Sequence, residues 1–238
     1  MVTKEGKKSS ESVIHVVSPY ALFFELEGPL TGGRRLMFDT LQRLMKKEKL
    51  GLTETVFARH GLNQPPALCV KNLIANLDGE GVSEDKMTEA FFNSLRLASA
   101  GAMKPAGTLV KLIEATRAHG APSVALSCLP AEVAAILAEK AGLTNRGVQV
   151  QAFHDAETAF PSRDIWLEVC RSLTRSPRRC FALVSTALAC STALAADLRV
   201  MAVPDEFTAY HDFGGAEWVC ETPAELSADE VIARMAPV

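Results

Sequence analysis

The sequence has no long hydrophobic run, and this absence argues against a membrane-spanning helix. A helix that crosses a bilayer needs about 20 consecutive apolar residues, whereas the apolar stretches of this chain are interrupted by serine, threonine or aspartate. Residues 1–12 are polar and contain two glutamates beside their lysines and serines. Because they lack the apolar centre of a secretory signal, we interpret them as a polar N-terminal tail.

Paired cysteines and an excess of positive charge are also absent. None of the six cysteines stands in a C-x-x-C pair, which argues against a zinc site or a redox dithiol. Free thiols are typical of a reducing, intracellular compartment; we expect the cytoplasm, with the mitochondrial or another organellar matrix as the alternative. The formal net charge of −3 argues against a nucleic-acid surface. We interpret basic clusters, such as Arg175 with Arg178 and Arg179, as solvated surface.

Several catalytic motifs are missing as well. The chain has no glycine-rich phosphate loop, no metal-spaced histidine cluster and no nucleophile elbow. His154, followed by Asp155, comes at the end of an expected strand and could form a His–acid dyad. A histidine in a loop is the simpler interpretation of this pair.

What the sequence does contain is a large apolar fraction and a regular alternation of strands and helices. Apolar residues make up 48% of the 238 residues, enough for a substantial core in one or two domains. Short apolar runs predict strands at 13–17, 20–24, 123–127, 148–153, 180–184, 200–203 and 218–219. Helical patterns predict helices at 108–119, 131–141, 164–174, 187–196 and 228–235. Repeated β–α units with near-continuous apolar strands indicate a parallel sheet with helices on both faces.

Residues 34–103 differ, because they show helical spacing and no convincing strand. Leu41 and Leu44, for example, belong to a stripe with helical spacing. We therefore expect a core domain made of residues 13–33 and 104–238, interrupted by a helical insertion at 34–103.

Polar residues follow three of the expected strands. Glu25, Ser127 and Ser185 each stand at or just after the end of an apolar run. Because ligands bind at the carboxyl ends of the strands in such sheets, we expect these residues to surround one crevice.

The segment from Tyr20 to Leu30, YALFFELEGPL, carries the most specific signal. An expected buried strand ends there in Glu25 and Glu27, followed by glycine and Pro29. This pattern resembles the first motif, Asp-x-Asp-Gly-Thr, of the haloacid dehalogenase (HAD) phosphohydrolase superfamily. The family's first aspartate attacks phosphorus and its second acts as general acid and base; Glu25 and Glu27 stand at these positions. Each glutamate keeps the carboxylate, but its extra methylene displaces the oxygen atoms by about an ångström, and reactive geometry tolerates little error.

The resemblance extends over most of the chain and is closest to the β-phosphoglucomutase-like branch. It implies an α/β fold, with a Rossmann-like core of parallel strands covered by helices on both faces and an inserted helical cap. Ser127 matches the family's phosphate-binding serine or threonine. The position of the family's lysine is Phe160, and its magnesium-binding acidic pair is replaced by Val184 and Ser185.

The scaffold pattern is thus retained while charges of the site are lost. Phosphoryl transfer depends on positioning and charge neutralisation, and magnesium prefers carboxylate oxygens. We therefore expect a catalytically inactive HAD-like protein that acts as a structural or protein-interaction subunit of a larger assembly, with no functional catalytic residue, no cofactor and no metal.

Two further hypotheses remain open. The first is a divergent Mg²⁺-dependent phosphohydrolase that acts on a small phosphate ester, with Glu25 as nucleophile or metal ligand. Its Mg²⁺ ligands would be Glu25, Glu27 and Ser185, and its cation would come from Arg163 or a cap lysine. The second is a non-catalytic protein that binds a small phosphate ester at Ser127.

Overall fold

The computed structural model describes residues 18–154 and 160–235. The predicted tail, the predicted strand at 13–17 and Asp155 lie outside these residues. The strands are β1 (Ala21–Glu25), β2 (Ser123–Ser127), β3 (Gln149–Ala152), β4 (Cys180–Val184), β5 (Arg199–Ala202) and β6 (Trp218–Val219). The α-helices are α1 (Gly33–Lys47), α2 (Glu54–His60), α3 (Pro66–Asn76), α4 (Glu84–Arg96), α5 (Gly107–Ala118), α6 (Ala131–Lys140), α7 (Arg163–Ser172), α8 (Ala187–Ala195) and α9 (Ala228–Met235). Short 3-10 helices are η1 (Pro29–Thr31), η2 (Thr144–Arg146), η3 (Pro177–Arg179) and η4 (Pro223–Glu225).

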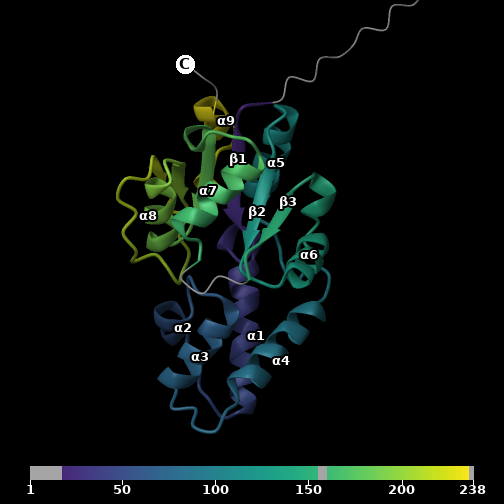
Figure 1. The fold of residues 1–238 in the computed structure, drawn as a ribbon, viewed down its shortest axis with the longest axis vertical. Coiled ribbons are helices and arrows are strands. Elements are labelled where there is room, and N and C mark those ends of the chain that lie inside the picture. The colour runs from purple at the N-terminus through teal and green to yellow at the C-terminus, as the bar shows by residue number, and fades with distance from the viewer. Residues whose placement is uncertain (1–17, 155–159, 236–238) are drawn as a thin grey trace, which may run out of the picture.

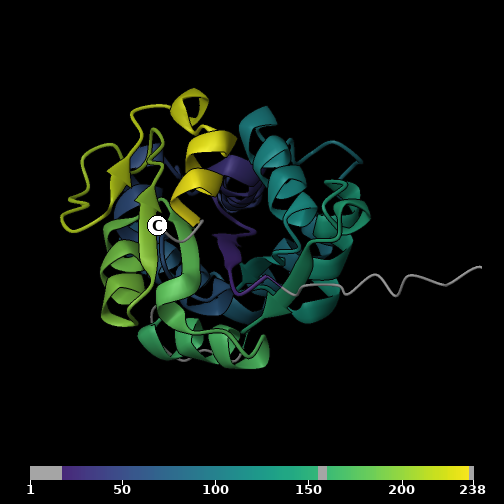
Figure 2. The same cartoon turned by 90° about the horizontal axis from the view of Figure 1, so that it is seen from above.

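The six strands form one parallel sheet in the order β3-β2-β1-β4-β5-β6. In the central strand, Phe24 stands opposite Ala125 of β2 and Leu183 of β4. Every residue of β1, β2 and β4 is buried, because helices cover both faces of the sheet (Figure 2). The predicted α/β class is confirmed, and each strand and helix predicted within the described residues agrees with the observed one to within two residues.

Alternate side chains of β1 enter the two faces of the core. Phe24 joins a hydrophobic cluster that contains Leu109 of α5 and Val231 of α9. Phe23 points to the other face, where its ring lies 6.4 Å from that of Trp166 of α7. Burying each such side chain contributes about 1.5–3 kcal/mol, so the near-continuous apolar run that predicts β1 also fixes it at the centre of the sheet.

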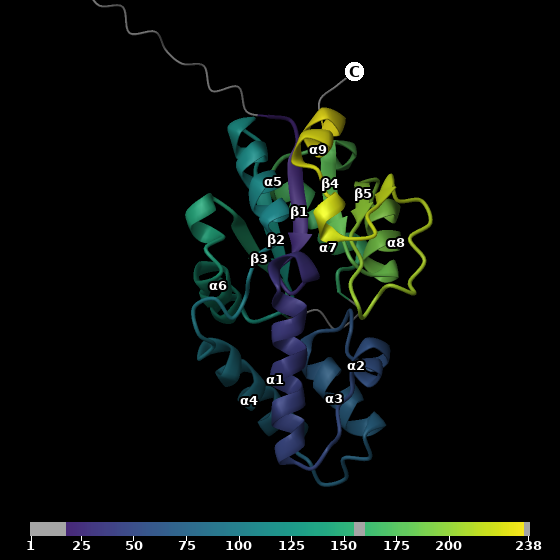
Figure 3. The same ribbon diagram turned by 180° about the vertical axis from the view of Figure 1, so that it is seen from behind.

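Helices α1 to α4 lie together beyond the carboxyl ends of the strands (Figures 1 and 3). Helix α1 packs on α4, α4 on α3, and α3 on α2. Residues 33–106, all of which the structure describes, contain no strand. Phe38, Leu41 and Phe91 of this helical layer belong to the same hydrophobic cluster as Phe24 of the sheet. The layer therefore covers the edge of the sheet at which ligands usually bind.

The chain enters and leaves the helical layer at adjacent points. Gly32 has a φ of +77°, and a Cβ on it would lie only 2.9 Å from the backbone nitrogen of Lys104. Nearby, the N–H of Ala106 donates to the carbonyl of Leu30 at 2.7 Å. Glycine is therefore required at Gly32 both for its left-handed backbone and for this close approach.

Within the residues that the structure describes, no helix combines the length and the apolar character that crossing a lipid bilayer requires.

Candidate functional site

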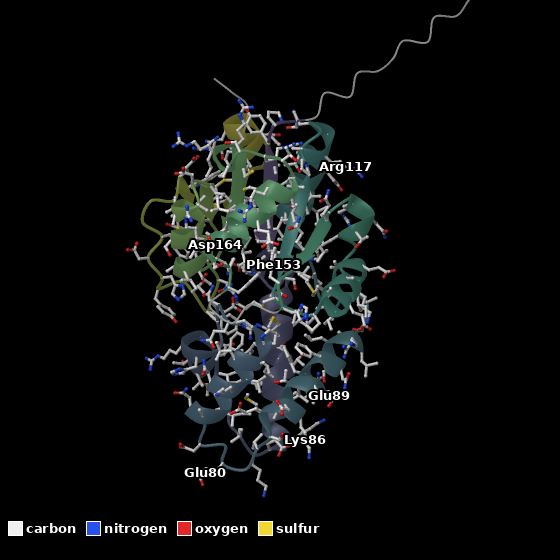
Figure 4. All side chains as sticks on the ribbon, in the orientation of Figure 1. Glu80, Lys86, Glu89, Arg117, Phe153 and Asp164 are labelled. Atoms are coloured by element: carbon white, nitrogen blue, oxygen red, sulfur yellow. The ribbon has the colours of Figure 1, made fainter. Side chains whose placement is uncertain are left out.

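The candidate site lies at the carboxyl ends of β1, β2 and β4. Glu25 ends β1, Ser127 ends β2 and Ser185 follows β4. The Ser185 hydroxyl donates to Glu25 Oε2 at 3.4 Å, and the Ser127 hydroxyl donates to Glu27 Oε1. Phe153, labelled in Figure 4, follows β3 at the same edge of the sheet. The parallel sheet thus brings together side chains that are up to 160 positions apart in the sequence.

A buried arginine, Arg34, holds the centre of this site and was not predicted from the sequence. Only 4% of Arg34 is exposed. Its Nη1 donates to both carboxylate oxygens of Asp205 at 2.9 Å, and its Nη2 donates to the Ser185 hydroxyl at 2.5 Å. The same Nη2 lies 3.7 Å from Glu25 Oε2. The guanidinium therefore bridges the carboxylate at the end of β1, the hydroxyl after β4 and the carboxylate after β5.

The local backbone explains why Arg34 points inward. A Cβ on Gly33 would collide with the carbonyl oxygen of Leu26, so only glycine lets α1 begin this close to the loop after β1. The next residue is then aimed at the strand ends, whereas Arg35 faces outward and pairs with two half-exposed glutamates. The sequence pair Gly-Gly before Arg-Arg was the one available signal, and it does not show which arginine is buried.

Asp205 is the second site residue that the sequence did not predict. Its carboxylate is oriented by hydrogen bonds within its own loop. Its Oδ1 accepts the N–H of Phe207 at 3.1 Å and the hydroxyl of Thr208 at 3.0 Å. These local bonds hold the carboxylate in one orientation in the loop after β5, so the ion pair with Arg34 is preorganised.

Glu25 is buried among these groups. Burial raises the pKa of Glu25 above its ordinary value, while the charge of Arg34 and the hydrogen bond from Ser185 act in the opposite direction. Its Oε1 atom has no hydrogen-bond partner among the described residues. The carboxyl of Glu25 therefore holds a proton more readily than a solvated glutamate does.

Glu27 has a separate environment beside Ser127. Removal from water raises the pKa of Glu27 to about 7, although the hydrogen bond from Ser127 opposes this rise. The Ser127 hydroxyl also accepts the N–H of Leu129 at 3.1 Å, and Ser127 has no exposed surface. Ser127 thus pairs with Glu27 Oε1, whereas Glu27 Oε2 stays buried without a partner among the described residues.

Phe160 closes one side of the site, at the position that the resemblance assigns to a lysine. It is 5% exposed, and its ring lies 6.5 Å from that of Phe153. Arg163, the first candidate for a replacement cation, does not reach Glu25: its Nε donates to the carbonyl of Ala195 at 2.9 Å, at the end of α8. The cation that pairs with Glu25 among the described residues is Arg34.

The loop between α2 and α3 closes the site from the helical layer. Asn63 Nδ2 donates to the Phe160 carbonyl at 3.1 Å and to the Thr186 hydroxyl at 2.8 Å. The Phe160 N–H donates back to the Asn63 carbonyl at 2.9 Å. Beneath this closure remains a cavity of about 50 Å³, lined by Glu25, Glu27 and Arg34 among others. This space suits a few water molecules and is well below the roughly 300–1,000 Å³ of typical ligand sites.

Solved structures resemble this architecture over most of the chain, although no protein-family model and no curated protein matches the sequence. β-Phosphoglucomutase from Clostridium difficile aligns with a TM-score of 0.71 at 12% identity, over 90% of this chain and 96% of that one. CbbY from Rhodobacter sphaeroides, in complex with phosphate, aligns with a TM-score of 0.66 at 17% identity, over 87% and 95%. A HAD family hydrolase from Deinococcus radiodurans, with bound phosphate and sodium, aligns with a TM-score of 0.67 at 19% identity, over 93% and 100%.

The fold is that of the HAD superfamily. The resemblance seen in the sequence is thus confirmed at the level of fold, and the segment α1–α4 stands where the resemblance implies a helical cap.

The donor set of this HAD-like site does not fit a magnesium ion. Val184 offers no side-chain oxygen, and the Ser185 hydroxyl accepts a hydrogen bond from Arg34. The guanidinium of Arg34 already places a positive charge 3.7 Å from Glu25, and magnesium would need several oxygen ligands in nearly octahedral geometry. Across residues 18–154 and 160–235, no three His, Cys, Asp or Glu side chains gather as a metal site.

Proposed function

We propose that this HAD-fold protein does not transfer phosphoryl groups and acts instead as a protein-interaction subunit of a larger assembly. The observation that supports the loss of phosphoryl transfer is the internal ion-pair network in which Arg34 joins Glu25, Ser185 and Asp205. A buried carboxylate paired with a fixed arginine is a poor nucleophile. The protein supplies its own cation, Arg34, to Glu25 and Asp205, while Glu25 Oε1 and Glu27 Oε2 stay without partners among the described residues.

The surrounding side chains support the loss of phosphoryl transfer. The reaction depends on positioning and on neutralising the charge of the moving phosphoryl group. Phe160 supplies no charge where the resemblance implies a lysine, and removing one preorganised electrostatic partner typically lowers a rate by about 100-fold or more. The Asn63 closure and the cavity of about 50 Å³ also leave little room for a sugar phosphate.

Phosphate binding at Ser127 is disfavoured by the same geometry. CbbY and the hydrolase from D. radiodurans hold phosphate in their solved structures. In this chain the Ser127 hydroxyl donates to Glu27, so a phosphate oxygen would have to displace a neighbouring carboxylate that is itself an anion above pH 7.

A second candidate function is a divergent phosphohydrolase that uses Glu25. Two observations favour it: Arg34 provides a cation 3.7 Å from Glu25, and the pKa of Glu27, about 7, is suited to a general acid and base. This candidate requires Arg34 to release Glu25 when a substrate enters.

Hydrolysis of an aryl phosphate with magnesium distinguishes the two candidates. The measurement compares the unaltered protein, Glu25→Ala, and Arg35→Gln as a folded control whose substitution lies at the surface. We expect no turnover above the buffer rate in any of them. Turnover in the unaltered protein and in Arg35→Gln that disappears in Glu25→Ala would establish the phosphohydrolase instead.

The interaction role requires a separate measurement of native size. The full chain is compared in its native extract and after purification alone, by sedimentation or size exclusion. We expect a species in the extract that is much larger than the 25.6 kDa chain, since a stable partner contact buries about 1,000 Å² or more. A chain that migrates as an isolated monomer in the extract contradicts the interaction role, whatever the outcome of the hydrolysis assay.

A further inference from the structure

A second concave site lies at the opposite end of the sheet, where β2 and β3 begin. Ser123, the first residue of β2, and Gln149, the first residue of β3, line a cavity of about 410 Å³. Figure 4 shows Arg117 at this end of the molecule, far from the helical layer α1–α4. Strand β2 spans about 13 Å between Ser123 and Ser127, so this cavity and the HAD-like site are separate. Its volume lies within the range of about 300–1,000 Å³ that is typical of small-molecule sites.

Three arginines from three different elements line this cavity, which we call the arginine pocket. Arg117 comes from the last turn of α5, Arg146 from η2, and Arg175 from the loop after α7. Arg117 lies across the turn before β3, with its Cδ 3.8 Å from where a Cβ on Gly147 would stand. The sequence predicts that Arg175 is solvated, but in the structure this residue is partly buried.

Two of the three guanidinium groups, those of Arg146 and Arg175, are held in place by backbone carbonyls. Arg146 Nη1 donates to the Gly142 carbonyl at 2.6 Å, and Arg175 Nη1 donates to the carbonyl of Leu173 at 3.0 Å. The Nε atoms of Arg146 and Arg175 are buried, and neither has a hydrogen-bond partner among the described residues. Because these Nε atoms have almost no exposed surface, a ligand would meet the Nη2 atoms instead, which keep solvent contact and donate to no acceptor among the described residues.

The arginine pocket is positively charged, whereas the whole chain carries a net negative charge. The formal net charge of the chain is −3, yet three arginines converge here. Among the described residues, the ion pair made by an arginine of this pocket is with Glu114, whose Oε1 lies 3.9 Å from Arg146 Nε. Within the residues that the structure describes, the Arg117 side chain takes part in no ion pair or hydrogen bond.

We propose that the arginine pocket binds a small phosphorylated molecule, with the three guanidinium groups holding its phosphate groups. Planar guanidinium groups match phosphate oxygens with paired donors, and three of them suit more than one negative charge. The volume of about 410 Å³ and the apolar part of the lining, including Ile113 and Leu173, favour a compact ligand over an extended acidic peptide. This inference does not rest on the function proposed for the HAD-like site.

Titration calorimetry of the full chain with inorganic pyrophosphate tests the proposal. We expect binding at one site that weakens as the salt concentration rises. Arg117→Gln is the principal variant, because its exposed side chain can be changed with least effect on the fold, and we expect it to weaken binding by about tenfold or more. Arg178→Gln is the matched control: it removes the same charge at the same end of the sheet, where Arg178 is exposed and pairs only weakly with Asp197 at 3.6 Å. We expect this control to leave the affinity unchanged.

Three outcomes would overturn the proposal. The first is no binding of pyrophosphate by the unaltered chain at millimolar concentration. The second is an equal loss of affinity in Arg117→Gln and Arg178→Gln, which would show a diffuse charge effect without a built site. The third is binding of a glutamate-rich peptide in the absence of pyrophosphate binding, which would assign the pocket to an acidic protein segment.

Discussion

Arg34 and Arg35 are neighbours in the sequence and lie in opposite environments. The side chain of Arg34 is 5% exposed and bridges two buried carboxylates, whereas that of Arg35 is 42% exposed and pairs with Glu54 and Glu206 at the surface. Removing one partner of a buried charge network leaves the other charges uncompensated, whereas exposed ion pairs contribute little. The two residues therefore provide a matched comparison within one turn of α1.

We predict that Arg34→Met lowers the free energy of unfolding by about 3–5 kcal/mol. Arg35→Met, which removes the same charge from the surface, lowers it by about 1 kcal/mol or less. Urea denaturation of the two variants and the unaltered protein provides the measurement. Equal, small effects would show that Arg34 is not the structural cation of the site.

A second residue-scale prediction concerns Glu27 and pH. The pKa of Glu27 is about 7 in the folded protein against an ordinary value of 4.5, so the folded state holds this proton more tightly than the unfolded state. The corresponding stabilisation is present below about pH 4.5 and is lost as the pH rises through about 7. Relative to Glu27→Gln, the unaltered protein therefore loses up to about 3 kcal/mol of stability across this window.

Unfolding free energies of both proteins between pH 4.5 and pH 8 check this prediction. Glutamine keeps an oxygen that can accept the Ser127 hydroxyl, so the variant changes only the titration. Glu25 titrates in both proteins, and because its charge contributes to the raised pKa of Glu27, the difference reports the coupled pair and not Glu27 alone. Parallel pH profiles would mean that Glu27 stays ionised in the folded state.

At the residue scale, the sequence predicts those site residues that stand at the end of a strand. Glu25, Ser127 and Ser185 come at the ends of apolar runs, and parallel pairing alone brings such ends to one edge. Arg34 and Asp205 escape prediction because they lie in a helix start and a loop, 171 positions apart. No local pattern encodes a contact of that separation, and polar residues in such segments are usually solvated.

At the scale of elements, the important contact is the one between the α2–α3 loop and the core. Asn63 has a φ of +58°, a conformation that asparagine tolerates better than most residues. This backbone turns its amide toward Phe160 and Thr186, on two different core loops. The loop also places the Gln64 carbonyl 3.8 Å from the sulfur of Cys128, so this thiol lies beneath the closure.

We predict that Asn63→Ala increases the rate at which a thiol reagent labels Cys128 in the folded protein. The variant loses both side-chain hydrogen bonds of the closure, each worth about 1 kcal/mol, so the opened state becomes about tenfold or more populated. Mass spectrometry resolves Cys128 from the other five cysteines, which are also buried and act as internal controls. An unchanged Cys128 rate would show that the apolar contacts, and not Asn63, hold the closure.

The elements themselves were predictable because their signals are local. Strands buried on both faces give continuous apolar runs, and glycine or proline marks the turns between them. The helical segment after β1 was recognised because its apolar residues repeat with helical spacing. How its loops dock on the core could not be predicted, because Asn63 and Phe160 are almost a hundred positions apart.

At the scale of the whole molecule, the sheet and the helical layer share one hydrophobic cluster. Phe24 of β1 and Leu73 of α3 both belong to it, and both are buried. Separate domains usually meet through smaller and more polar contacts. The boundaries at residues 33/34 and 103/104 therefore stay a prediction. They mark where the helical segment is inserted in the chain and do not imply that it unfolds separately from the core.

We predict a single cooperative unfolding transition for the whole molecule. Fluorescence of Trp166, which is buried in the core, and urea-dependent labelling of Cys69, which is buried in α3, should give the same midpoint. Labelling of Cys69 at a lower urea concentration than the tryptophan transition would contradict this expectation. The helical layer would then unfold as a unit of its own.

The contact between Gly32 and Lys104 has a consequence for how a gene for this fold can change. A segment whose two ends touch can be lengthened, shortened or exchanged in one event without altering the path of the strands. Such an exchange would leave the order of the sheet intact, because β1 and β2 lie on either side of the junction. Recombination at this junction could therefore replace the helical layer α1–α4 by another segment while the core continues to fold.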